Sequence, residues 1–114
     1  MADKVFNENA FFEHLGGDRE LGDEILSVYI VDAPARVESL AEALQIDDLD
    51  LVVKFSHALK GISATIRAER VASLAEKIER LARKGDLSSV KSHLPLVREE
   101  LDLVLNKVTS VLGT

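Results

Sequence analysis

The sequence contains no cysteine and little of several other residue types. Without cysteine the chain cannot form disulfides, use a thiolate nucleophile or bind zinc through sulfur. It has no tryptophan, four phenylalanines, one tyrosine and two prolines, which leaves little material for β-strands. Basic residues are outnumbered, because 14 Lys and Arg face 20 Asp and Glu, for a net charge of −6. This balance, with no basic run, argues against binding to nucleic acid or to an anionic membrane surface.

Long apolar segments are also missing from the sequence. No run approaches the roughly 20 residues that a membrane span needs, and the N-terminus lacks the pattern of a signal peptide. We therefore expect a soluble, cytoplasmic protein. Its length of 114 residues suits one domain, residues 1–114, which buries roughly two-thirds of the surface of its unfolded chain.

Residues that strongly favour helices are the most abundant in the sequence. Ala, Leu, Glu, Lys and Arg make up 54 of the 114 residues, near the ~50% that is typical of helical chains. Apolar residues recur at helical spacing in successive segments that are joined by short turns. The sequence therefore predicts an all-α fold, an antiparallel four-helix bundle with a short additional N-terminal helix.

Capping residues predict the first boundaries. Residues 1–7 form a lead-in, and Asn7 caps a short helix that ends at the two glycines 16–17. Asp18 caps the next helix. Pro34 is expected to kink or restart this second helix, because proline has no N–H and its ring crowds the preceding turn.

Similar signals divide the rest of the chain. Asp48 is expected to cap a helix over residues 49–66, and the following helix starts near Ala68 and stops at Gly85. In the last helix, Pro95 is expected at a bend or in the first turn.

The helix over residues 49–66 carries the candidate chemistry. At 100° per residue its apolar residues fall within roughly 120°, which predicts the face that meets the core. These residues are Leu51, Val52, Phe55, Ala58, Leu59, Ile62 and Ile66. His57 lies about 170° from the centre of this face and is expected to point to solvent. Most histidines on an outer helical face are simply solvated, so position alone does not assign a function.

The neighbours of His57 favour a functional site. Lys60, Gly61 and Ala64 share its face, three, four and seven positions further along. Lys60 places a cation near anything negative on the imidazole. Gly61 inside a helix costs about 0.5–1 kcal/mol relative to alanine, which suggests that the space is needed. Val53 adds an apolar side chain one turn earlier, and we expect Val53 and Ala64 to contact a docking partner.

Metal binding and acid–base catalysis need partners that the helix does not supply. No carboxylate or second histidine flanks His57 at helical spacing, and neither a His-Glu-x-x-His nor a Glu-x-x-His pattern occurs. What remains is covalent catalysis by the ring, since a neutral imidazole is a good nucleophile at cellular pH.

The segment from His57 to Gly61 resembles the His-x-x-Lys-Gly signature of histidine-containing phosphotransfer (HPt) domains. The resemblance extends over most of the chain and implies a phosphorelay carrier rather than an enzyme. His57 would be phosphorylated through Nε2, Lys60 would steady the phosphoryl oxygens, and Gly61 would leave clearance. The partners implied are a receiver domain, a histidine kinase or both. Such a carrier needs no cofactor of its own, because Mg²⁺ and the acidic cluster belong to the receiver.

One position departs from the family pattern. Members usually have a second glycine ten residues after the histidine, and this chain has Arg67. We interpret Arg67 as a solvated residue near the helix end, with an altered turn or a role in partner selection as alternatives. His14 and His93 are expected to be surface residues without a role.

Two other functions stay open. One is a helical adaptor that binds a signalling partner through the same face without being phosphorylated. The other is a metal- or haem-binding bundle, which has little support because inward-facing ligands are missing. A monomer is the simplest expectation for the oligomeric state.

Overall fold

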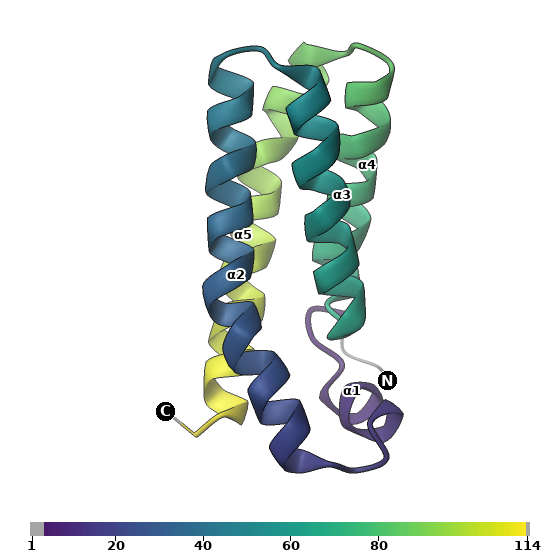
Figure 1. Cartoon of the computed structure of the whole chain (residues 1–114), viewed down its shortest axis with the longest axis vertical. Helices are drawn as coiled ribbons and strands as arrows, with labels where there is room; N and C mark the ends of the chain where they lie inside the picture. Colours follow the sequence, from purple (N-terminus) through teal and green to yellow (C-terminus); the bar gives the residue numbers. More distant parts are fainter. Residues whose placement is uncertain (1–3, 114) are drawn as a thin grey trace.

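The computed structural model describes residues 4–113. It has five helices and no strand within that range. They are α1 (Glu8–His14), α2 (Arg19–Gln45), α3 (Leu49–Thr65), α4 (Glu69–Arg83) and α5 (Leu87–Val111). The four long helices run side by side as an antiparallel bundle, and α1 lies below the C-terminal end of α3 (Figure 1). The predicted all-α bundle with a short N-terminal helix is confirmed.

Side-chain caps begin four of the five helices. The carboxamide of Asn7 accepts a hydrogen bond from the N–H of Ala10 at the start of α1. Asp18, Asp48 and Asp86 accept in the same way at the starts of α2, α3 and α5. Each cap satisfies one of the N–H groups that the first turn of a helix leaves without a partner. The predicted caps at residues 7, 18 and 48 are therefore confirmed. Of the expected lead-in, residues 1–3 lie outside the described part of the chain.

Both prolines sit inside helices, where the sequence predicted a kink or restart at Pro34 and a bend or a first-turn position for Pro95. Helix α2 continues through Pro34 without restarting, although its first turns lean away from the axis of the rest (Figure 1). Pro95 lies well inside α5 rather than in its first turn. Both helices pack an apolar face along the bundle, and that packing outweighs the hydrogen bond that each proline removes.

The face that α3 buries is rotated from the predicted one. Val52, Leu59 and Ile66 are buried as expected, but the other four residues of the predicted face are only half-buried. Two serines are buried instead. The Ser56 hydroxyl donates to the carbonyl of Val52 at 2.7 Å, and Ser63 bonds the Tyr29 hydroxyl at 2.9 Å. A pattern based on apolar residues alone misses this face, because satisfied hydroxyls are small enough to enter it.

Helix α1 packs against the lower end of the bundle. The Phe12 ring lies against Gly22 of α2, so closely that a Cβ at Gly22 would overlap it. The guanidinium of Arg19 covers the same ring at 4.3 Å from its centroid. The Asn7 N–H also donates to the carbonyl of Arg67 at 3.2 Å. None of the helices in residues 4–113 is both long and apolar enough to cross a membrane.

Candidate functional site

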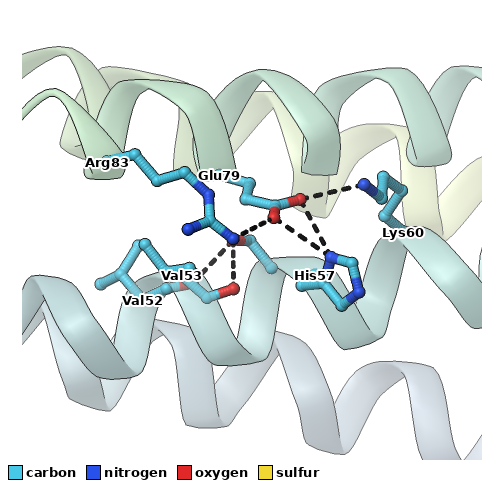
Figure 2. Close-up of polar contacts among 7 residues, drawn as sticks. Val52, Val53, His57, Lys60, Glu79 and Arg83 are labelled. Atoms are coloured by element: carbon cyan, nitrogen blue, oxygen red, sulfur yellow. Dashed lines mark hydrogen bonds and ion pairs between the residues drawn. The ribbon is translucent and has the colours of Figure 1, made fainter.

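His57 projects from the middle of α3, on the side turned away from the core. Its side chain keeps 64% of its exposure. The backbone holds it there because Val52 and Leu59, two turns apart on the opposite face of α3, are completely buried. The ring points towards α4, and its second nitrogen faces away from the protein atoms drawn around it (Figure 2).

A buried carboxylate from the next helix holds one ring nitrogen. Glu79 of α4 places Oε2 3.1 Å and Oε1 3.3 Å from Nδ1 of His57. Only 6% of Glu79 is exposed, and it is the only buried charged residue in the described part of the chain. The site therefore includes residues of two helices, His57 of α3 and Glu79 of α4. The sequence analysis looked for partners of His57 within α3 alone and did not find Glu79.

The sequence does contain a signal for Glu79. Its neighbours on the helix face are Ala75, one turn before, and Ala82, three residues after, and both are buried. A carboxylate in the apolar stripe of an amphipathic helix has to be paired, because burying an isolated charge is costly. That placement could have marked Glu79 as a site residue before the structure was known.

Two cations complete the pairing of Glu79. The Lys60 Nζ lies 3.1 Å from Oε1, and a terminal nitrogen of Arg83 lies 2.9 Å from Oε2 (Figure 2). Burial by itself raises the pKa of Glu79. The hydrogen bonds that Arg83, Lys60 and His57 donate outweigh this effect and lower the pKa to about 2, from an ordinary value of 4.5. The carboxylate is therefore ionised at every physiological pH.

The charge state of Glu79 fixes the tautomer of His57. An ionised carboxylate can only accept hydrogen bonds, so Nδ1 of the ring must carry the proton. In the neutral ring the lone pair then lies on Nε2, the nitrogen that points outward. Geometry and charge together present a nucleophilic nitrogen to solvent.

The surface beside the ring is open. A Cβ built at Gly61 meets no atom within 4 Å outside its own helix turn. Gly61 and Ala64 are exposed, Lys60 is half-buried, and Val53 is half-buried with contacts to the core. The five residues singled out from the sequence thus lie together along the outer side of α3.

Arg67 occupies the turn that ends α3. Its φ is +67°, in the left-handed region. The N–H of Ala68 donates to the carbonyl of Ser63 at 2.9 Å, and the N–H of Arg67 to that of Ala64 at 3.0 Å. These are the two bonds of a Schellman motif, in which glycine is the usual left-handed residue. A side chain with a Cβ costs roughly 1–2 kcal/mol there. Arg67 therefore forms the same turn that a glycine would form, at an energetic cost, and the alternative that it alters this turn is wrong.

The other two histidines have separate surroundings. His14 is exposed in the last turn of α1. Nδ1 of His93 lies 2.7 Å from the carbonyl oxygen of Ser89, within its own helix. Among residues 4–113 no group of three acidic or histidine side chains is placed to hold a metal ion.

Comparison with known proteins identifies similar chains. A sequence model described as the Hpt domain matches residues 24–107. The fold is similar to histidine-containing phosphotransfer protein B of Pseudomonas aeruginosa PAO1, with a TM-score of 0.90, 20% identity, and coverage of 96% of this chain and 95% of that one. It is also similar to the HPT domain of a sensor hybrid histidine kinase from Shewanella (TM-score 0.84, 21% identity, 96% and 95% covered). ZmHP2 from maize gives a TM-score of 0.83 with 26% identity over 98% of this chain and 83% of that one. No curated protein sequence matches significantly.

Proposed function

Because the chain belongs to the Hpt domain family, a family of phosphotransfer carriers, we propose that it is a phosphorelay carrier with His57 as the phosphorylated residue. The group would come from a receiver-domain aspartate or a histidine kinase and pass on to another receiver aspartate. The observation that carries this proposal is the exposed ring of His57, with Nδ1 held by the buried carboxylate of Glu79 and Nε2 free.

The transfer step follows from the orientation of the ring. The Nε2 lone pair attacks the phosphorus of an aspartyl phosphate, and an N–P bond forms as the P–O bond to the aspartate breaks. The electron pair of that bond leaves with the aspartate carboxylate. The ring becomes cationic while Nδ1 keeps its proton, and the negative charge of Glu79, 3.1 Å away, stabilises it. Reversal of the same step hands the group to the next aspartate.

The remaining residues are assigned supporting roles. Lys60 lies one turn beyond His57 with its Nζ beside the same carboxylate, from where we propose that it reaches the phosphoryl oxygens. Gly61 leaves room for the partner, and Val53 and Ala64 contact it. Mg²⁺ is proposed to reside on the receiver, and the chain's own residues act by positioning and charge.

Labelling tests the proposal directly. The protein, incubated with a panel of receivers and kinases carrying radioactive phosphate, should acquire phosphate that is labile in acid and stable in base. His57→Gln should abolish the labelling and leave the helical circular dichroism unchanged, because the side chain is exposed. His93→Gln is the matched control and should label normally. Labelling that persists in His57→Gln would reject the assignment.

A non-phosphorylated adaptor is the alternative function. The same face could bind a partner non-covalently, since Gly61 leaves it bare. In that case the wild type would bind receivers but never acquire phosphate, and Gly61→Ala would weaken binding more than His57→Gln. The labelling experiment, run with a binding assay on these two variants, separates the two functions.

A further inference from the structure

Arg67 occupies a backbone conformation that glycine would adopt without strain. Its φ of +67° lies in the left-handed region, and the described part of the chain has one other non-glycine residue there, Asp47 at φ +54°. Backbone strain that persists in a fold invites the question of what the side chain does. At Arg67 the side chain is long and cationic, and the turn itself does not require it.

The place of Arg67 connects it to the proposed site. It ends the α3 wall of a shallow groove between α3 and α4, and the same wall carries Lys60, Gly61 and Ala64. Arg67 follows His57 by ten residues, which corresponds to about 15 Å along the helix axis. A standard protein interface covers about 800 Å² on each partner and is roughly 30 Å across. A domain centred on His57 therefore reaches Arg67 at the edge of its interface.

The charge of Arg67 has no counterpart within the described residues. Its Nε is buried without a hydrogen-bond partner, and no described carboxylate lies within ion-pair distance of it. Glu69 and Glu76 line the opposite wall of the groove without reaching it. Lys60, by contrast, is already paired with Glu79. Arg67 is thus the cation on this wall whose charge is left for a partner.

We infer that Arg67 is a specificity-determining contact, whose guanidinium binds a carboxylate of the receiver domain that docks over Gly61 and Ala64. The inference rests on the proposed function, because it requires a receiver at His57. A carboxylate is the fitting ligand, since the planar guanidinium pairs with it through two parallel hydrogen bonds. The contact selects among receivers according to whether they carry an acidic residue at this distance from the phosphorylated aspartate.

Three variants separate charge from backbone strain. Arg67→Gly removes both the charge and the strain, and Arg67→Gln removes the charge alone. Asp47→Gly removes the corresponding strain in the turn before α3, at the opposite end of that helix from Arg67, together with the exposed ion pair of Asp47 with Lys91. Each is compared with the wild type by thermal unfolding and by kcat/KM for transfer from a phosphorylated receiver that labels the wild type, at several salt concentrations. Labelling by phosphoramidate, a small donor that touches no docking surface, is measured in parallel.

The expected pattern is specific to a charge contact. Both Arg67 variants should lose about five-fold in kcat/KM from the receiver and show a weaker dependence on salt. Both should be labelled by phosphoramidate as fast as the wild type. Arg67→Gly and Asp47→Gly should unfold at higher temperature, and Asp47→Gly should transfer normally.

Other results would overturn the inference. If Arg67→Gln transfers like the wild type with an unchanged salt dependence, the guanidinium makes no such contact. The same conclusion applies if Arg67→Gly alone transfers more slowly, because the changed conformation of the turn would then explain the loss. In both cases labelling of the wild type would leave the proposed function intact. A wild type that no receiver or kinase labels would refute the proposed function, and this inference with it.

Discussion

Glu79 organises the candidate site at the scale of single residues. One buried carboxylate accepts hydrogen bonds from His57, Lys60 and Arg83, which come from two helices. The three donors are partly exposed, whereas Glu79 is 6% exposed. Removing Glu79 would therefore let each donor turn to water rather than leave it buried and unpaired. The main effect of a substitution should fall on the chemistry of His57.

Glu79→Gln should slow phosphotransfer while preserving the fold. The amide carries no charge and can donate as well as accept, so it neither fixes the proton on Nδ1 nor stabilises the cationic ring. The difference between a charged and a neutral hydrogen bond is worth about 1.4 kcal/mol, which corresponds to about tenfold in rate. Single-turnover transfer from a phosphorylated receiver measures the rate, and ¹⁵N chemical shifts of His57 report the tautomer. An unchanged rate would remove Glu79 from the mechanism.

The pH dependence of stability provides a second test of the same pairing. The pKa of Glu79 falls to about 2 in the folded protein, from an ordinary value of 4.5. The ion pairs of Glu79 therefore stabilise the fold above pH 4.5, and this contribution disappears as the pH falls towards 2. Urea unfolding should show Glu79→Gln less stable than the wild type at pH 7, with the gap closing by pH 2. A gap that stays constant would contradict the assigned pKa.

The sequence predicted the residues that α3 contributes to the candidate site, but not those of α4. The spacing along α3 placed His57, Lys60 and Gly61 on one outer face, and the structure puts them there. Glu79 was missed, because its contacts with His57 and Lys60 cross between helices and depend on how α3 and α4 are rotated against each other. Arg83, which pairs with Glu79 one turn along α4, was missed with it. Helical periodicity describes one helix at a time and contains no information on that rotation.

At the scale of elements, the contact between α1 and α2 depends on a missing side chain. Gly22 lies inside α2, where alanine would normally be preferred, and the Phe12 ring fills the place of its Cβ. Arg19 lies over the same ring. Gly22 is thus used for close packing rather than for backbone flexibility.

Gly22→Ala should loosen α1 although alanine is the better helix former. The added methyl must displace the Phe12 ring, and overpacking of this kind typically costs about 1–3 kcal/mol. This loss exceeds the gain of about 0.5–1 kcal/mol in helix propensity. Gly61→Ala is the matched control, because its Cβ would meet nothing and the substitution should stabilise the protein. Chemical unfolding and amide hydrogen exchange in α1 measure the effect; a Gly22→Ala protein as stable as Gly61→Ala would contradict the packing argument.

Element boundaries were more predictable than the paths of the helices. Asn7, Asp18 and Asp48 cap where the sequence indicated, since a cap is a contact within four residues of the chain. Pro34 was expected to kink or restart its helix and Pro95 to lie at a bend or in a first turn; the restart and the first-turn position are wrong, because both helices continue through their prolines. Local rules give the free energy that a helix loses at a proline. Whether the helix continues depends on the apolar surface that it buries against its neighbours, which those rules do not describe.

At the scale of the whole molecule, the surface favours a single chain in solution. The exposed large apolar side chains among the described residues are spread over α2, the turn after it and α5. They are Leu21, Val28, Val31, Ile46, Leu96 and Leu103. A net charge of −6 adds mutual repulsion between copies.

Solution scattering should therefore report a monomer. The Cα radius of gyration is 14.3 Å and the bundle measures 42 × 25 × 19 Å. A measured radius slightly above 14.3 Å, owing to side chains and hydration, and the mass of one chain are expected at low and high protein concentration. A concentration-dependent doubling of the mass would show that a surface of the bundle is used for self-association.

The single outward nitrogen of His57 has a consequence for the order of events. Glu79 occupies the Nδ1 side of the ring, so in the proposed relay a donor and an acceptor have to approach the same nitrogen, Nε2. The two partners must consequently take turns, each leaving before the other arrives. An excess of either one would then slow the relay, and throughput should peak at intermediate amounts of both.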